Sequence, residues 1–237
     1  MIPKIIHYCW LSGDPFPPLI QKCIDSWRKL LPNYEFVLWD KSKLDSVHSV
    51  WASQAFENKK YAFAADYLRC YSVYNFGGIY LDTDVEVCRS FDEFLTNESF
   101  MGFDSRGDLE AAIFGAARHA QWLKKALDFY EGRRFVNPDG GFNIITMPKV
   151  FKMALADELA SVHNKNIVNR CSTISLYPYD YFSPKDYANG IIKTTPRTVA
   201  IHHFNAGWLK DNRLLMLRHR MKLLLSKFLG ANNLLFK

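Results

Sequence analysis

The sequence contains little cysteine and no CxxC pair, since its five cysteines are scattered over 237 residues. An odd number without close spacing gives poor support to a structural zinc site or to a disulfide framework. Cys9, Cys70 and Cys88 lie in apolar stretches, where free cysteine behaves as a small hydrophobic residue. We therefore expect a protein of a reducing compartment.

Long apolar runs, repeats and low-complexity linkers are also missing from the chain. No stretch approaches the roughly 20 apolar residues that span a bilayer, and Met1–Lys4 lacks the features of a cleaved leader. The sequence therefore predicts a cytoplasmic protein. Because 49% of the residues are hydrophobic, the apolar content suffices for a single core, and one folded body is expected rather than disorder.

The body of the chain lacks an excess of charge of either sign. Residues 1–208 contain 23 Lys and Arg against 23 Asp and Glu by count, whereas residues 209–237 contain seven basic residues and one acidic residue and so carry the whole net charge of +6. A protein that binds nucleic acid is expected to place basic residues along a groove or face of its fold. We therefore expect no nucleic-acid partner.

The basic residues of the C-terminal tail are interleaved with apolar ones over Leu214–Leu229. This pattern is typical of an amphipathic helix on an anionic membrane surface, and the alternative is a terminal helix packed on the body with its cations solvated. We expect a folded body over 1–208 and a basic amphipathic tail over 209–237. Residues 210–237 would then place the protein peripherally on the inner face of the membrane.

The patterns that are present indicate an α/β fold. Lys4–Trp10 is a near-continuous apolar run that predicts a buried strand, residues 19–31 are apolar at helical spacing, and Tyr34–Trp39 predicts a second strand. This order opens an α/β fold with a mostly parallel sheet. Residues 41–60 are weakly patterned. Further strands are expected at Val85–Cys88, Phe100–Phe103, Ala111–Gly115, Thr173–Tyr177 and Thr198–His203, and further helices near 61–75, 119–131, 148–160 and 212–229.

Two carboxylates, Asp82 and Asp84, end the short apolar strand that follows the helix over 61–75. Chance alone produces such an Asp-x-Asp pair in a chain of this composition, so its context has to support it. Residues two apart at a strand end point the same way, and two hard oxygen donors suit Mg²⁺ or Mn²⁺. The alternative is a solvated acidic turn.

The acidic pair belongs to a set of three segments, Ile5–Trp10, Ala65–Arg69 and Gly77–Asp84. These segments resemble the DXD-containing glycosyltransferase family of capsular polysaccharide synthesis enzymes. The relatives of that family include the Golgi initiating α-1,6-mannosyltransferases and, more distantly, the large glucosylating toxins. The resemblance implies a GT-A fold, in which a Rossmann-like, mostly parallel sheet flanked by helices binds a nucleotide sugar. It is strong over residues 2–104, fair over 109–131 and thin to about 196, with a later match at Ala200–Trp208.

The resemblance implies that three residues near the first and third strands contact the donor. Trp10 would stack on the nucleotide base, the backbone near Cys9 would help, and Tyr80 would line the sugar pocket. From the residues alone, Trp10 is otherwise a core tryptophan, because large aromatic residues are mostly buried.

The resemblance also implies roles for four charged residues. Asp66 and Arg69, which share one side of a helix, would hydrogen-bond hydroxyls of the donor sugar. Asp82 would touch ribose, sugar or metal-bound water, and Asp84 would bind the metal directly. The alternative for the helical pair is a surface ion pair of little energetic value.

Two adjacent histidines, His202 and His203, close a late strand. Neutral imidazole is a good third ligand for Mn²⁺, and adjacent strand residues face opposite ways, so only one histidine can reach the metal. We choose His203, which is nearer the following loop; the alternative is that both histidines are structural. In the family this segment folds over the donor diphosphate, and Trp208 would contact its oxygens.

One departure from the family concerns the acceptor side of the site. The family often has Asn near the start of the segment that corresponds to Leu109–Gly115, and this chain has Glu110 nearby. A carboxylate there either binds acceptor hydroxyls or sits close behind the reactive carbon of the sugar.

Together these features predict a metal-dependent glycosyltransferase that uses Mn²⁺ or Mg²⁺. The resemblance implies retention of anomeric configuration, with the leaving phosphate taking the acceptor's proton. A UDP-sugar is favoured over a GDP-sugar as donor, and the acceptor is a polysaccharide, an oligosaccharide or a lipid-linked glycan, as in capsule biosynthesis. The alternatives are a metal-dependent nucleotidyltransferase or phosphohydrolase on the same acidic site, and a non-catalytic basic adaptor.

Overall fold

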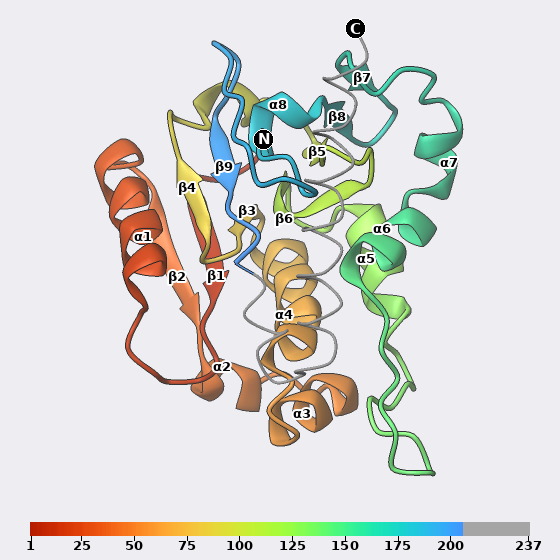
Figure 1. Ribbon diagram of the computed structural model, residues 1–237. Helices are drawn as coiled ribbons and strands as arrows, with labels where there is room; N and C mark the ends of the chain where they lie inside the picture. Colours follow the sequence, from red (N-terminus) through yellow and green to blue (C-terminus); the bar gives the residue numbers. More distant parts are fainter. Residues whose placement is uncertain (206–237) are drawn as a thin grey trace, which may run out of the picture.

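A seven-stranded sheet runs through the computed structural model, which describes residues 1–205 (Figure 1). The strands are β1 (Ile5–Cys9), β2 (Glu35–Trp39), β3 (Gly78–Leu81), β4 (Val85–Val87), β5 (Ser99–Phe103), β6 (Leu109–Ala116), β7 (Asn169–Arg170), β8 (Ser175–Tyr177) and β9 (Ala200–His202). The helices are α1 (Pro18–Leu30), α2 (Lys41–Asp45), α3 (Val50–Glu57), α4 (Tyr61–Phe76), the 3₁₀ helix η1 (Asp92–Phe94), α5 (Gln121–Asp128), α6 (Met147–Ala154), α7 (Ala156–Ala160) and α8 (Tyr179–Phe182).

The expectations for Trp208 and for the tail concern residues beyond 205. The predicted helix over 212–229 and the boundary between body and tail therefore lie outside the described residues. Within residues 1–205, no helix combines the length and the apolar character that crossing a bilayer requires.

The main sheet has the strand order β2-β1-β3-β6-β5-β8-β7. The pairs β1–β2, β1–β3 and β5–β8 are parallel, and the pairs β3–β6, β5–β6 and β7–β8 are antiparallel. Five of the seven strands therefore point the same way, with β6 and β7 reversed. The prediction of a mostly parallel sheet is confirmed.

Helix α1 joins the first two strands and follows the predicted segment closely. Pro18 stands in its first turn, where the missing N–H costs no helical hydrogen bond. Its inner face includes Trp27, which is fully buried and donates from Nε1 to the carbonyl oxygen of Val85 at 2.6 Å. This bond ties α1 to the strand that begins next to the acidic pair.

Apolar residues form a cluster on each face of the sheet, as the alternation of strand side chains requires. In β3, Ile79 and Leu81 join one cluster and Tyr80 joins the other. One cluster packs beneath α3 to α6 and includes Trp39, Trp51, Leu68, Phe114, Trp122 and Phe151. The other packs against α1, β4, β9 and α8 and includes Ile6, Trp27, Phe91, Phe94, Phe100 and Phe182.

The diglycine after α4 turns the chain directly into β3. Gly77 has φ +67° and ends the helix, and Gly78 has φ +109°, a conformation that residues with a Cβ rarely adopt. A Cβ at Gly78 would lie 2.6 Å from the carbonyl oxygen of Ile5. The close approach of β1 and β3 therefore requires glycine, and it fixes where β3 and its terminal carboxylates begin.

A second sheet consists of β4 paired antiparallel with β9, and the two strands lie side by side in Figure 1. Val85 is opposite His202 in this pairing, and Val87 is opposite Ala200. The pairing brings the end of the described chain next to Asp84, which immediately precedes β4.

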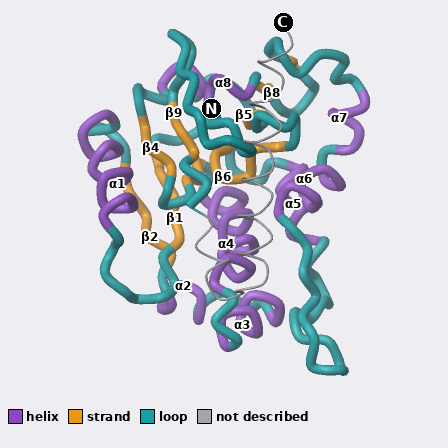
Figure 2. Tube along the Cα trace, in the orientation of Figure 1, coloured by secondary structure: helices purple, strands orange, loops and turns teal. Residues whose placement is uncertain are grey.

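Several elements were not predicted by the sequence patterns. The weakly patterned residues 41–60 contain α2 and α3, whose first turns are capped when Asp40 accepts from the Lys43 amide and Ser49 from the Ala52 amide. The helix expected over 148–160 is divided at Leu155 into α6 and α7. Strand β7 and helix α8 were also missed. Figure 2 shows a long loop between α5 and α6 that projects away from the sheet.

His7 is a buried histidine in the middle of β1, with 1% of its surface exposed. Trp39 donates from Nε1 to its Nδ1 at 3.2 Å, and Nε2 donates to the carbonyl oxygen of Gly77 at 2.8 Å. These partners require a neutral ring protonated on Nε2. Burial lowers the pKa of His7 to about 4, although the Gly77 bond opposes this, and the Lys43 ammonium lowers it further.

Acidification is expected to reduce the free energy of unfolding through His7. The unfolded chain binds a proton below the ordinary pKa of 6.5, whereas folded His7 stays neutral down to about pH 4, so stability is lost as the pH falls through this window. The complete loss is about 3 kcal/mol. Urea unfolding of the wild type and of His7→Gln across this pH range measures it. The free energy of unfolding of His7→Gln should lack the part of the decrease that comes from His7. An identical pH dependence of this free energy in both proteins would contradict the prediction.

Candidate functional site

Most of the predicted site residues lie around the carboxyl ends of strands β1 and β3. Trp10 and Asp82 directly follow these two parallel strands. Strand β6 runs the opposite way, so Glu110 near its start lies at the same edge. Asp84 leads into β4, whose pairing with β9 adds His202. This edge is where α/β sheets form ligand-binding crevices.

Arg69 of α4 is a buried residue that bridges two carboxylates, and its side chain is 7% exposed. Its Nη2 lies 3.0 Å from Oδ1 of Asp66 and 3.2 Å from Oδ1 of Asp82. Its Nη1 donates to Oδ2 of Asp82 at 3.4 Å and to the carbonyl oxygen of Ala111 at 2.8 Å. The alternative of a surface ion pair is therefore wrong, because Asp66 and Arg69 are buried.

The acids around Arg69 outnumber it. Burial raises the pKa of Asp66 to about 6, with the Arg69 charge opposing the shift and Asp82 adding to it. Burial also raises the pKa of Asp82, and Arg69 opposes this shift while the neighbouring charge of Asp84 reinforces it. The Arg69 guanidinium is therefore shared between two carboxylates, Asp66 and Asp82, and one positive charge does not neutralise both.

Tyr80 and Cys9 complete the inner wall of the site. The Tyr80 hydroxyl donates to Oδ1 of Asp82 at 2.9 Å, and its ring, 1% exposed, stacks on Phe114. The Arg69 guanidinium lies 4.8 Å from the centre of the Tyr80 ring. Burial raises the pKa of the Cys9 thiol to about 12. Tyr80 thus contacts the acidic pair through its hydroxyl alone.

His202 lies between two carboxylates on the other side of the acidic pair. Its Nε2 is 3.5 Å from Oδ1 of Asp84, and its Nδ1 is 3.1 and 3.2 Å from the two carboxylate oxygens of Glu110. Burial alone would lower the pKa of His202, but the charges of Glu110 and Asp84 hold it well above its ordinary value. In turn His202 and the Asn205 amide, which donates to Asp84 Oδ2 at 2.7 Å, keep the pKa of Asp84 at about 2 against the effect of burial.

The choice of His203 as the third ligand does not fit this geometry. His203 faces away from the acidic pair, and its Nε2 lies 2.9 Å from Oε2 of Glu86, which also pairs with Lys22. The two histidines do face opposite ways, as expected, but the β4–β9 register turns His202 inward. The structure therefore brings His202 to Asp84 in place of His203.

Asp82, Asp84 and His202 together have the chemistry of a cation site. Each offers one ligand atom, and the three atoms lie within 4.8 Å of one another. Two carboxylate oxygens and one imidazole nitrogen suit Mn²⁺, and carboxylate oxygens also suit Mg²⁺. The residues present therefore fit a divalent cation.

Trp10 is half-buried and borders a hollow, so it is not a core tryptophan. Its Nε1 donates to the carbonyl oxygen of Asp14 at 2.7 Å, and its ring meets the edge of Phe16. The hollow has a volume of about 330 Å³ and is lined by Trp10, Leu11, Ser12, Gly13, Asp40, Lys41, Ser42, Phe56 and Tyr61. An aromatic ring at the end of β1 thus faces a space with both apolar and polar walls.

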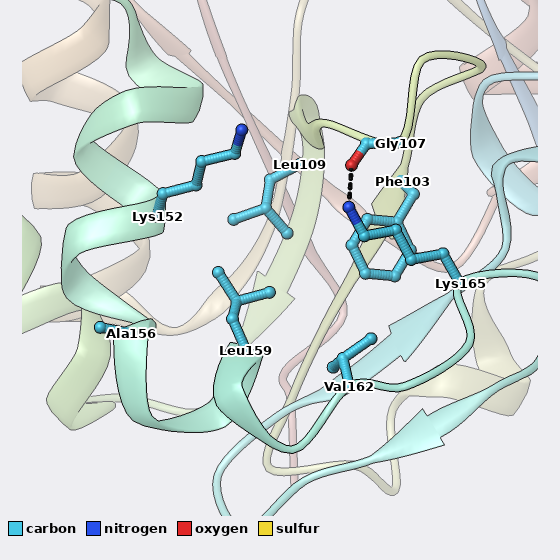
Figure 3. A pocket seen from close by; sticks show the side chains of 8 residues that line it. All are labelled: Phe103, Gly107, Leu109, Lys152, Ala156, Leu159, Val162 and Lys165. Atoms are coloured by element: carbon cyan, nitrogen blue, oxygen red, sulfur yellow. Dashed lines mark hydrogen bonds between the residues drawn. The ribbon is translucent and has the colours of Figure 1, made fainter.

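A second hollow, of about 250 Å³, lies between the β5–β6 hairpin and helices α6 and α7 (Figure 3). Figure 3 shows the side chains of Leu109, Leu159 and Val162 around it. Lys165 donates to the carbonyl oxygen of Gly107 at 2.6 Å at its rim. The sequence patterns did not predict this hollow, because its walls come from two distant parts of the chain, 103–109 and 152–165.

Comparison with known proteins gives a match to one family. Residues 17–101 match the model of the "glycosyltransferase sugar-binding region containing DXD motif". This range includes Asp66, Arg69, Tyr80 and the acidic pair, and it ends before Glu110 and His202.

Curated relatives match over about half of this chain. The chain is 31% identical over 146 residues to the mannosyl phosphorylinositol ceramide synthase SUR1 of Saccharomyces cerevisiae, with 57% of this chain and 37% of the relative covered. It is 32% identical over 129 residues to inositol phosphoceramide mannosyltransferase 3 of Schizosaccharomyces pombe, with 52% and 35% covered. The chain thus spans little more than a third of the length of these relatives.

A solved structure shares the fold. The PaToxG glycosyltransferase superposes with a TM-score of 0.50 and 20% identity, covering 67% of this chain and 70% of its own. This likeness agrees with the predicted GT-A type of sheet. The superposition shows the fold alone, and residues 17–101, which contain the acidic pair, match the family of glycosyltransferases whose sugar-binding region contains a DXD motif.

Proposed function

We propose that this chain is a metal-dependent retaining glycosyltransferase that moves a sugar from a nucleotide-sugar donor to a glycan or lipid-linked acceptor. The observation that supports this most directly is the meeting of Asp82, Asp84 and His202 within 4.8 Å at the edge of the sheet. They lie beside the buried Asp66–Arg69 pair and near the hollow at Trp10. A cation, a pyrophosphate and a nucleotide base would each find suitable partners there.

In this proposal the DXD carboxylates serve as ligands and take no part as general acid or base. A divalent cation held by Asp84 and His202, with Asp82 directly or through water, supplies positive charge to the departing diphosphate, where electrostatic catalysis is most effective. Arg69 fixes the orientation of Asp82 through its two contacts. Asp66, which is less buried than Arg69, offers oxygen to the donor sugar.

The nucleotide base would occupy the hollow at the end of β1. Trp10 would stack on it there, and Tyr61, Ser42 and Asp40 provide polar groups along the same wall. These groups are half-buried or exposed, and they would offer hydrogen bonds to the polar edge of the base.

The donor and acceptor are proposed from the relatives. Their names describe mannosyl transfer and inositol phosphoceramide, so we propose a mannose-bearing donor and a phosphoinositol-type lipid as the first pair to test. An acceptor in a membrane agrees with the expected membrane contact of residues 210–237, whose basic composition suits anionic lipid.

A screen of UDP- and GDP-sugars with Mn²⁺ tests the proposal. We expect one donor to yield nucleoside diphosphate together with free sugar or glycoside, and EDTA to abolish the release because the carboxylates alone repel the diphosphate. Adding back Mn²⁺ should restore it. Release of nucleoside monophosphate or of inorganic phosphate instead would favour the phosphohydrolase or nucleotidyltransferase alternative, which uses the same acidic pair.

A further inference from the structure

We propose that Glu110 is a positioning residue that orients His202 as a metal ligand. Glu110 would accept a hydrogen bond from the N–H at Nδ1 of His202, so that Nε2 is the nitrogen that would give its lone pair to a cation shared with Asp84. This inference rests on the proposed metal dependence and adds a carboxylate that lies outside the DXD motif. It also gives a role to Glu110, whose function the sequence left open.

The geometry of the imidazole supports this role. Nδ1 of His202 lies 3.1 and 3.2 Å from the two oxygens of Glu110, and Nε2 points at Asp84 from 3.5 Å. The ring also packs against Phe204, with 4.0 Å between ring centres. A neutral imidazole has one donor and one acceptor nitrogen, so a carboxylate at Nδ1 fixes the acceptor at Nε2.

Glu110 is itself held in place. It is 3% exposed, and its Oε1 also accepts the amide hydrogen of Ala112 at 3.0 Å within β6. A metal-ligating histidine commonly donates its other N–H to a carboxylate, which fixes the tautomer and raises the basicity of the ligand.

The two roles considered from the sequence fit less well. A carboxylate that binds acceptor hydroxyls, or that sits behind the reactive carbon of the sugar, has to present an oxygen to the substrate. Both oxygens of Glu110 face His202, and one of them is also occupied by the Ala112 amide. The carboxylate therefore acts through the histidine.

Mn²⁺ affinity measured without any nucleotide sugar provides the test, since unbound Mn²⁺ is quantified directly by electron paramagnetic resonance. We expect Glu110→Gln to weaken Mn²⁺ binding by about 10- to 100-fold, the usual cost of losing such a partner. Glu158→Gln is the matched control, because Glu158 on α7 is another buried glutamate and accepts a hydrogen bond from the Thr173 hydroxyl. The control should bind Mn²⁺ like the wild type.

Glu110→Asp, which keeps the charge but shortens the side chain, should also weaken Mn²⁺ binding, and this variant replaces Glu110→Gln in the test if Glu110→Gln does not fold.

A double-mutant cycle separates positioning from a simple attraction between charges. In the His202→Ala background, Glu110→Gln should change Mn²⁺ affinity by less than about twofold, because the histidine through which it acts is gone. Turnover of the single variant should recover when Mn²⁺ is raised to saturation. Unchanged affinity with lost transfer, or equal losses in both backgrounds, would overturn the inference. Normal Mn²⁺ binding by a wild type that transfers no sugar would refute the proposed function and leave the role of Glu110 standing.

Discussion

Replacing Asp84 by Asn is expected to lower metal-dependent release of nucleoside diphosphate by about 10²- to 10³-fold. Asp84 is the acid of the pair that faces His202, and its pKa of about 2 means that it is ionised throughout the useful pH range. Asparagine has nearly the same shape and keeps an oxygen for the Asn205 amide, which donates to Asp84 at 2.7 Å. The substitution therefore removes mainly the charge that would hold the cation.

A control for this experiment is Asp128→Asn, at an exposed acid that pairs with Lys124 on α5. The control should keep its full rate of release at every Mn²⁺ concentration. In the Asp84 variant, raising Mn²⁺ should restore only part of the rate, because a direct ligand is missing. If the Asp84 variant releases nucleotide as fast as the control does, the assignment of the metal site is wrong.

The part of the fold that was predictable has strong local signals. The apolar run at Ile5–Cys9, the amphipathic segment of α1 and the diglycine after α4 all lie where the sequence placed them. The helices α2 and α3 were missed because their apolar spacing is weak. Their caps, Asp40 and Ser49, are local signals that could have revealed them.

No local sequence signal marks the division between α6 and α7. Leu155 stands at the break, and the segment from 148 to 160 contains no glycine or proline after Pro148 that would stop a helix. The break arises in the packed structure, where Leu155 is fully buried. Tertiary packing therefore sets the boundary between α6 and α7, and the helix propensity of the local sequence does not predict it.

The histidine assignment shows a different limit. Alternation along a strand predicts that His202 and His203 face opposite ways, but it does not say which of them faces inward. That choice is made by the register in which Val85 lies opposite His202, a pairing between distant parts of the chain. The contact of His202 with Glu110 depends on the same pairing, which explains why the sequence left the role of Glu110 open.

The spacing of Asp66 and Arg69 predicted that they share a side of α4, but it did not predict their burial. Asp25 and Arg28 have the same spacing on α1. Nη1 of Arg28 lies 4.0 Å from Oδ1 of Asp25, and both side chains are mostly exposed. The difference lies in the surroundings: α4 packs against the sheet, and Asp82 and Ala111 approach Arg69 from two strands. The same local pattern thus yields a surface pair in one helix and a buried network in the other.

Replacing Arg69 by Met is expected to lower the free energy of unfolding by about 3–5 kcal/mol, because it leaves two buried carboxylates without their cation. Asp66 and Asp82 would then face each other's charge in a poorly solvated site. Urea unfolding at neutral pH measures the effect. The matched control is Arg28→Met, which breaks the exposed pair of the same spacing and should cost less than about 1 kcal/mol.

Two further measurements test whether the loss of stability comes from the uncompensated charges of Asp66 and Asp82. Adding Asp66→Asn to the Arg69→Met protein should recover part of the loss, since it removes one uncompensated carboxylate. Lowering the pH toward 5 should also reduce the difference in the free energy of unfolding between Arg69→Met and the wild type. Burial already raises the pKa of Asp66 to about 6 and loss of the Arg69 charge raises it further, so protonation of Asp66 removes its charge in this pH range. Equal destabilisation by Arg28→Met and Arg69→Met would contradict the prediction. A loss of stability in Arg69→Met that does not depend on pH would show that Arg69 stabilises the fold by packing and not by neutralising the acids.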